Sequence, residues 1–280
     1  MNFEEQFIFA CKYGDLEDAK NILKKNPNIN ISYKDEQAFI YACQKGYLEL
    51  AQWLYSVKQT IDISIDDNIP FWSSCTNGHL EVAQWLYSVK PTIINSIINE
   101  EKFNLTCKFG RLQVAKWLLQ LKPTINISTN NDDTFKWTCL NGDLEVAQWL
   151  LQIKPDINIS FNNEFAFRWA CRNGHLQVAQ WLYTLPGKPT INISADNDFA
   201  FKYACKDKNF CKNRHLPVAQ WLQTLKPFKY KILYKYNDCI SYKINTDCKE
   251  SLLFILYSLT FKNYTNSLTP KFVINIQKYL

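Results

Sequence analysis

Apolar residues recur along this chain at spacings that predict short, paired helices. Phe39, Ala42 and Cys43 lie at i, i+3 and i+4, which places them on one face of a helix beginning near residue 35. Gly46 predicts the end of that helix, because glycine adopts positive φ without steric cost and lets the chain reverse. The second helix, around Trp53, is apolar over most of its circumference. Neighbouring helices must therefore cover it on several sides.

The whole pattern occurs seven times, about 32 residues apart. Its phenylalanine recurs at Phe7, Phe39, Phe71, Phe103, Phe135, Phe167 and Phe201, and its cysteine follows four residues later at Cys11, Cys43, Cys75, Cys107, Cys139, Cys171 and Cys205. Self-similarity at this period predicts stacked helix–turn–helix units, none of which can bury its apolar surface alone. We interpret the recurring tryptophans as a ladder in the core and not as an aromatic track for ligands.

The segment after each second helix also repeats, as Lys-Pro-Thr-Ile-Asn-Ile-Ser at 122–128. Proline ends the helix there, and a lysine beside the helix C-terminus suits its dipole. The alternation of isoleucine and asparagine predicts a short extended stretch. An acidic, Asn-rich turn follows, and its residues are good N-caps for the next first helix.

The order Ala-Cys-x-x-Gly-His-Leu-x-Val-Ala-x-Trp-Leu at 170–182 resembles the ankyrin repeat, and the resemblance covers about residues 3–226. It implies an all-α ankyrin-repeat solenoid with short extended loops, in which seven repeats precede a degenerate C-terminal cap. The Thr-Pro-Leu-His of many ankyrin units is replaced by Phe-Ala-Phe-Arg at 165–168, so we expect phenylalanine packing to compensate. The Asn-, Ile- and Lys-rich composition is similar to that of ankyrin proteins of amoeba-infecting giant DNA viruses.

The periodicity ends near residue 227, which predicts two regions: the repeat array at 1–226 and a basic capping region at 227–280. Residues 206–280 contain 13 of the 32 lysines and arginines but 4 of the 26 aspartates and glutamates. Residues 228–245 read as a β-hairpin, and 251–261 and 270–280 as two helices. A degenerate closing repeat explains this region, and a separate recruitment element is the alternative.

The chain shows no sign of catalysis or of a cofactor or metal site. The seven equivalent cysteines are one repeat apart, about 10 Å in stacked helices, whereas disulfide-bonded Cα atoms lie within about 7 Å. We therefore expect reduced, buried thiols. His79, His175 and His215 recur in one structural context, Gly-His-Leu. Neither a phosphate-binding glycine loop nor a nucleophile elbow is present, so we predict a protein that is not an enzyme and takes no small-molecule substrate.

Phe, Cys, Gly, Leu, Ala and Trp recur at equivalent positions of the repeats, whereas the positions beside them vary. This pattern predicts a scaffold that binds another protein through the concave face of the array, acting as a monomer. The candidate contact residues are Trp72, Asn104, Lys136, Arg168 and Lys202 near the first helices and Asp66, Glu100, Asp132, Glu164 and Asp198 on the turns. The alternative function is nucleic-acid or chromatin association through the basic C-terminal region. No apolar run spans a membrane, and no signal peptide precedes the array. We expect an intracellular location, in a host cytoplasm or nucleus or in a virion, without secretion.

Overall fold

The computed structural model describes residues 2–92, 97–127, 129–205, 215–227, 229–236, 239–246 and 251–253. The chain divides into two compact units. The first contains Met1–Thr138 and Glu145–Ile157, and the second contains Cys139–Leu144 and Asn158–Leu280. Each unit is described by itself.

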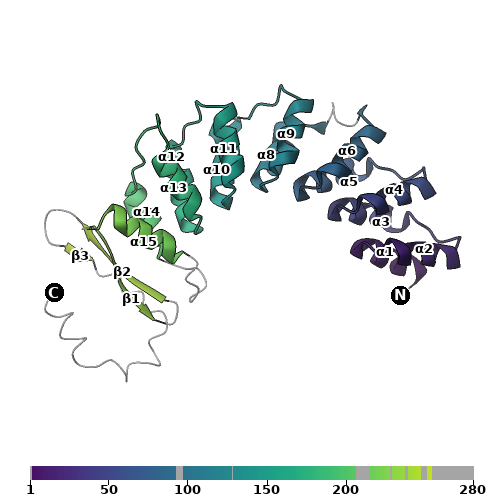
Figure 1. Cartoon of the computed structure of the whole chain (residues 1–280), viewed down its shortest axis with the longest axis horizontal. Helices are drawn as coiled ribbons and strands as arrows, with labels where there is room; N and C mark the ends of the chain where they lie inside the picture. Colours follow the sequence, from purple (N-terminus) through teal and green to yellow (C-terminus); the bar gives the residue numbers. More distant parts are fainter. Residues whose placement is uncertain are drawn as a thin grey trace, which may run out of the picture. The chain divides into compact units, whose positions relative to one another are not determined.

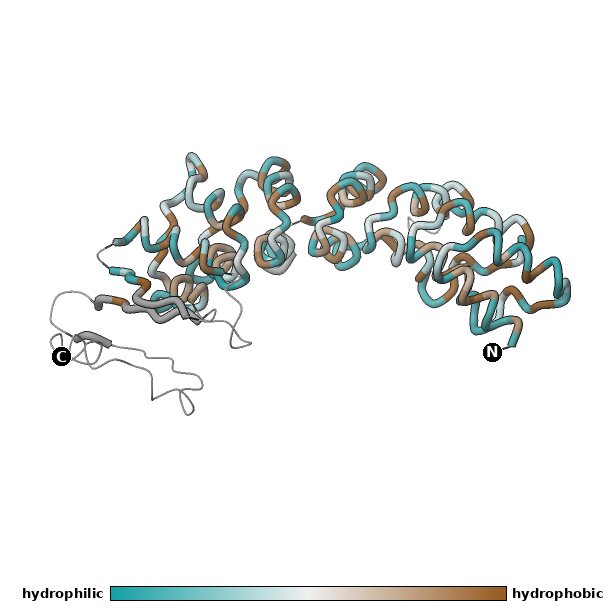
Figure 2. Tube along the Cα trace, turned by 60° about the horizontal axis from the view of Figure 1, so that its bottom comes forward, coloured by the Kyte–Doolittle hydropathy of each residue, from teal (hydrophilic) through white to brown (hydrophobic). Residues whose placement is uncertain are grey.

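Fourteen helices lie in the described residues, and they form consecutive pairs (Figure 1). Those with most of their residues in the first unit are α1 (Phe3–Tyr13), α2 (Leu16–Lys25), α3 (Tyr33–Lys45), α4 (Leu48–Val57), α5 (Ile65–Asn77), α6 (Leu80–Val89), α8 (Glu100–Lys108), α9 (Leu112–Leu121), α10 (Thr129–Asn141) and α11 (Leu144–Ile153). The second unit contains α12 (Phe161–Arg172), α13 (Leu176–Thr184), α14 (Ala195–Ala204) and α15 (Leu216–Leu225), followed by strands β1 (Tyr230–Tyr236), β2 (Cys239–Thr246) and β3 (Ser251–Leu253). The predicted all-α array of about seven helix pairs is confirmed. Hydrophobic and hydrophilic stretches are interspersed along the helical part of the chain (Figure 2).

A glycine in the left-handed conformation ends the first helix of most pairs. Gly46 has φ 79°, and its N–H donates to the carbonyl oxygens of Ala42 and Cys43. A Cβ atom at this position would lie 2.4 Å from Nδ1 of His79, which opens the second helix of the next pair. His175 covers Gly142 in the same way. These histidines therefore pack against backbone, and the desolvation lowers the pKa of His79.

The acidic, Asn-rich turns adopt a conformation that the sequence did not reveal. Three successive residues, Asn162, Asn163 and Glu164, have φ values of 52°, 55° and 63°, and the equivalent triplets at 34–36, 66–68 and 196–198 do the same. Asn and Asp tolerate this left-handed region better than most side chains do. The expected N-capping is confirmed at Asn99, whose side chain accepts from the N–H of Lys102 at 2.9 Å at the start of α8. At α12 it is wrong, because the preceding residue, Ser160, makes no side-chain cap and the triplet forms a left-handed turn instead.

Carboxylate and lysine side chains close several repeats on themselves. Glu164 accepts a hydrogen bond from the backbone N–H of Asn192 at 3.2 Å, which joins the start of α12 to the loop after α13. Lys90, just after α6, donates to Oγ of Ser64 at 2.6 Å, just before α5. Lys122 reaches the carbonyl oxygen of Ile98 at 2.6 Å in the corresponding place. These bonds tie the end of the second helix, or the loop after it, to the start of the first helix of the same repeat.

Phenylalanines and tryptophans join each repeat to the next. In the first unit, the ring centroids of Phe103 and Trp149 lie 6.3 Å apart, and in the second unit those of Phe167 and Trp221 lie 6.2 Å apart. The phenylalanine rings are fully buried, whereas the indoles are only half-buried. The expected core ladder is therefore built by phenylalanine, and tryptophan forms its cover. All seven equivalent cysteines are buried and free, as predicted.

The segment after α15 forms the predicted hairpin. β1 and β2 pair antiparallel, with Tyr230 opposite Ile244. The helix expected from residue 251 is wrong over Ser251–Leu253, because β3 pairs there with the second edge of β2. The remainder of that helix and the one expected at 270–280 lie outside the described residues. The Tyr230 ring stacks on Phe201 with centroids 4.2 Å apart, and its hydroxyl donates to Asp198 at 2.7 Å.

The different burial of the two aromatic positions predicts different costs on truncation. Phe103→Ala removes a fully buried ring and should lower the free energy of unfolding by about 3–5 kcal/mol. Trp149→Ala removes a half-buried ring and should cost roughly half as much. Chemical denaturation of the full chain measures both changes, with Gln148→Ala, an exposed position on the same helix, as the control. Equal losses for the two aromatic variants would contradict this division of roles.

Burial of the thiols predicts that stability falls at alkaline pH. Desolvation raises the pKa of Cys11 from 9.0 to about 12 and raises the pKa of the six equivalent thiols further. The stabilisation is complete below pH 9, and it is lost as pH rises because the unfolded thiols release their protons first. The unfolding midpoint should therefore fall as pH rises above 9. Cys139→Ala should make this decline less steep, and rapid labelling of these seven thiols in the native protein at pH 8 would refute their burial.

Candidate functional site

Aromatic side chains gather on the outer face of the first helices, two residues after each buried phenylalanine. This offset turns about 200° around a helix and therefore points away from the core. We call these positions the ridge; they are Phe9, Tyr41, Ser73, Leu105, Trp137, Trp169 and Tyr203. Phe9 and Trp137 are 54% and 39% exposed, and the other ridge residues are half-buried. Large apolar side chains that stay partly exposed in an ordered helix are candidates for binding.

Cations cover several of the ridge rings. In the first unit, Lys12 Nζ lies 5.4 Å from the ring centroid of Tyr41, and Lys108 Nζ lies 4.6 Å from that of Trp137. In the second unit, Arg172 Cζ lies 4.9 Å from the centroid of Tyr203. Each of these cations comes three residues after the ridge position of its own repeat and reaches the ridge ring of the next one. Such cation–π contacts contribute about 0.5–1 kcal/mol at exposed sites.

The largest group of this kind lies on α12 and α14. Phe165 and Trp169 have centroids 5.6 Å apart, Trp169 and Phe199 5.7 Å, and Phe199 and Tyr203 4.2 Å. The Arg172 guanidinium lies over this surface, 4.1 Å from the Trp169 centroid. All five side chains are half-buried, and we call them the Arg172 cluster.

Arg172 is held in place by rings and not by a charge. Among the residues that the structure describes, it makes no ion pair and no hydrogen bond through its side chain. Its planar fork of N–H donors is therefore oriented but not engaged. A guanidinium in this state suits a carboxylate from another molecule, which it can bind through two parallel hydrogen bonds.

The neighbouring Arg168 has a different role. It is 6% exposed, and it donates from Nε to the carbonyl oxygen of Asn163 at 2.6 Å and from Nη2 to that of Asn162 at 3.0 Å. It also forms an ion pair with Asp196. Arg168 thus stabilises the left-handed turns of two consecutive repeats, and its donors are used inside the array.

The ten predicted contact residues differ in burial. Trp72, Lys136, Arg168, Glu164 and Asp198 are buried. Asp66 is exposed, whereas Asn104, Lys202, Glu100 and Asp132 are half-buried. For all ten, contact with a partner stays a prediction.

Sequence reasoning missed the ridge because its aromatic residues looked like additional core. The signal that could have found it is the repetition of Phe, Tyr or Trp two residues after the core phenylalanine, a spacing that one helix face cannot accommodate. Within the described ranges, no group of three or more metal-ligating side chains occurs and no helix is long and apolar enough to cross a membrane. The arrangement offers aromatic faces and oriented cations to another molecule.

These features define a helical repeat protein that carries a half-exposed aromatic and cationic surface. The model of a family of ankyrin repeats, which describes three copies, matches residues 7–97 and again residues 103–197. Because these segments cover more than half of the 280 residues, the chain belongs to the ankyrin repeat family. The comparison with curated proteins found no match.

Proposed function

We propose that this protein is a non-enzymatic scaffold that binds another protein through the ridge, with the Arg172 cluster as the main contact of the second unit. Proteins with ankyrin repeats generally serve protein–protein interaction. The observation that carries the proposal is the oriented Arg172 guanidinium over rings that stay half-exposed. Trp, Tyr and Arg dominate the residues on which binding energy concentrates at protein interfaces.

The finer features of this function rest on the sequence. The chain acts as a monomer inside a host cell or a virion, and its composition supports an origin in a giant virus. The alternative, nucleic-acid binding through the basic C-terminal region, has less support, because two of its lysines bind the array. Lys226 donates to Ser194 at 3.4 Å, and Lys229 forms an ion pair with Asp198 at 2.9 Å.

Site-specific photocrosslinking tests the ridge. A photoreactive phenylalanine analogue in place of Tyr203, introduced in a cell that expresses the full chain, should give discrete crosslinked protein bands. The same analogue at Gln180, which is exposed on the second helix α13, is the matched control and should give few. Adding Arg172→Gln should reduce the Tyr203 bands at least fivefold, because the oriented donor is lost while the buried core is unchanged.

Two results would contradict this function. Crosslinks of equal yield at Tyr203 and Gln180 would show that the ridge is not the binding face. Bands that persist undiminished with Arg172→Gln would remove the cluster from the interface. Circular dichroism must show that the variant keeps its helical signal and thermal midpoint.

We also propose that residues 227–280 cap the array formed by residues 1–226. Support comes from Tyr230, which is 0% exposed and lies against Phe201, where preceding phenylalanines meet the tryptophan of the next repeat. Its hydroxyl lies 3.0 Å from Oγ of Ser194 in addition to its bond to Asp198. The closing segment thus supplies the aromatic cover that an eighth repeat would bring.

Substitutions at Tyr230 separate the ring from the hydroxyl. Tyr230→Ala should lower the free energy of unfolding by about 3–5 kcal/mol, because it uncovers the buried Phe201 ring. Tyr230→Phe keeps the stack and removes one donor to the Asp198 carboxylate, which Lys229 still contacts, so it should cost about 0.5–1.5 kcal/mol. Lys231→Ala, at an exposed neighbour, should change little. Denaturation midpoints check all three, and an unaffected Tyr230→Ala protein would contradict the capping role.

A further inference from the structure

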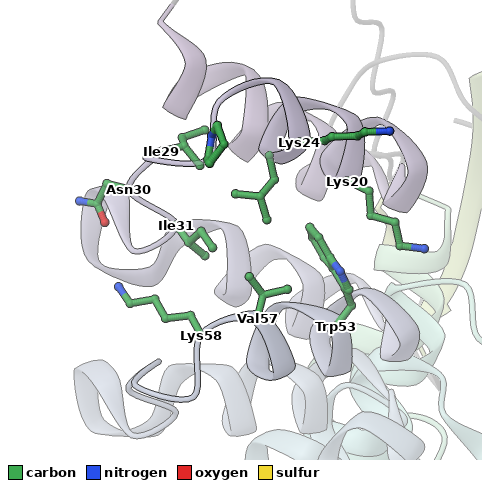
Figure 3. A pocket seen from close by; sticks show the side chains of 10 residues that line it. Lys20, Lys24, Ile29, Asn30, Ile31, Trp53, Val57 and Lys58 are labelled. Carbon is green, nitrogen blue, oxygen red and sulfur yellow. The ribbon is translucent and has the colours of Figure 1, made fainter.

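The first two repeats enclose an apolar pocket with a basic rim. It lies between α2, the loop after α2 and α4, and its volume is about 610 Å³ (Figure 3). Leu23 and Trp53 are among the apolar side chains that line it, and Lys20, Lys24 and Lys58 contribute its cations. None of the lining residues is acidic. Pockets of roughly 300–1,000 Å³ are the usual size of sites that enclose a ligand group.

One aromatic side chain is replaced at this pocket. At three later junctions, a tyrosine of one second helix packs edge-on against the tryptophan of the next. The centroids of Tyr55 and Trp85 lie 5.9 Å apart with the rings at 80°, and those of Tyr183 and Trp221 lie 5.8 Å apart at 85°. The equivalent of Tyr55 in the first repeat is Leu23. Trp53 therefore has no tyrosine against this side of its indole, and the vacated volume opens to solvent.

We propose that this pocket binds an aromatic side chain carried by an acidic segment of a partner protein. The incoming ring would restore at Trp53 the edge-on contact that tyrosine makes at Trp85 and Trp221, a geometry that aromatic pairs prefer. The lysines at the rim of the pocket favour acidic residues on either side of the aromatic residue in the partner segment. Of these lysines, Lys24 makes no ion pair among the described residues, and the partner of Lys20, Glu17, is 79% exposed.

Two other repeats carry the same leucine but not the same rim. Leu119 and Leu151 stand at the position of Leu23, and a glutamine, Gln120 or Gln152, replaces Lys24 in each. The first repeat thus combines a missing tyrosine with an added cation. This site lies on the second helices and the loop, apart from the ridge, so it goes beyond the function proposed above.

A peptide with one aromatic residue tests the pocket. The probe is a fluorescein-labelled nonapeptide of glutamate and glycine with a single central tyrosine, and its counterpart carries alanine there. Fluorescence anisotropy with the full chain at about 0.05 M salt should show saturable binding of the tyrosine peptide, which falls as salt screens the lysines. The alanine peptide should bind at least tenfold more weakly. Equal affinity for the two peptides, or no binding of either, would overturn the proposal.

The array itself provides the blocking variant and its matched control. Leu23→Tyr fills the pocket with the ring found at Tyr55, so it should keep the thermal midpoint and weaken the tyrosine peptide at least tenfold. Leu119→Tyr makes the same change at a later junction and should leave affinity unchanged. The double variant Lys20→Glu and Lys24→Glu should also weaken binding at least tenfold. The same effect from Leu23→Tyr and Leu119→Tyr would overturn the site.

Two further measurements fix the occupant and keep the two proposals separate. A single-stranded thymidine oligonucleotide that binds the chain and loses affinity with Leu23→Tyr would overturn the assignment to a peptide. The assignment to a peptide is supported if the oligonucleotide does not bind, or if Leu23→Tyr leaves its affinity unchanged. Crosslinking at Tyr203 should be unchanged by Leu23→Tyr. If the peptide does not bind the pocket, the proposal for the ridge therefore still stands. If crosslinking at the ridge fails, the peptide result for the pocket still stands.

Discussion

Within each unit, a buried phenylalanine of one repeat packs against an aromatic side chain that follows it in the chain. Trp149 covers Phe103, Trp221 covers Phe167, and at the last repeat Tyr230 covers Phe201. This constraint accounts for the period of the tryptophans and for the place where it ends. In α2, the exposed Asn21 occupies the tryptophan position. The stability of a repeat therefore depends on its successor, as expected for a quasi-one-dimensional array.

Because these buried side chains form the core, the side chains on the outer face of the first helices are not needed for it. Phe167 and Cys171 satisfy the interior, and the buried Arg168 holds the turns through hydrogen bonds to Asn162 and Asn163. Trp169 and Arg172 are left to meet solvent, and they contact each other and their neighbours without being enclosed. A surface of this kind keeps its side chains ordered before a partner arrives, which lowers the entropy cost of binding.

The sequence predicted the fold because each repeat packs against its neighbours through the same buried positions. Apolar residues therefore recur at a fixed period along the chain. The sequence could not separate the fully buried Phe103 from the half-buried Trp149, since both recur with equal regularity. It also equated variable positions with exposed ones. Glu164 and Arg168 are nevertheless buried, because their polar atoms find partners inside the array: Glu164 accepts from the N–H of Asn192, and Arg168 donates to the carbonyl oxygens of Asn162 and Asn163. The turns misled in a similar way, since Asn and Asp favour both N-caps and the left-handed conformation.

The first repeat shows where such an array gains freedom to bind. Tyr87 covers one side of the Trp117 indole of the next repeat. At Trp53 the equivalent position is Leu23, and Lys20 and Lys24 line the same pocket. Leu119 and Leu151 carry the same leucine further along the chain, but Gln120 and Gln152 follow them. The combination of an indole without its tyrosine and an added cation, and not the loss of tyrosine alone, therefore distinguishes the junction that can carry a site.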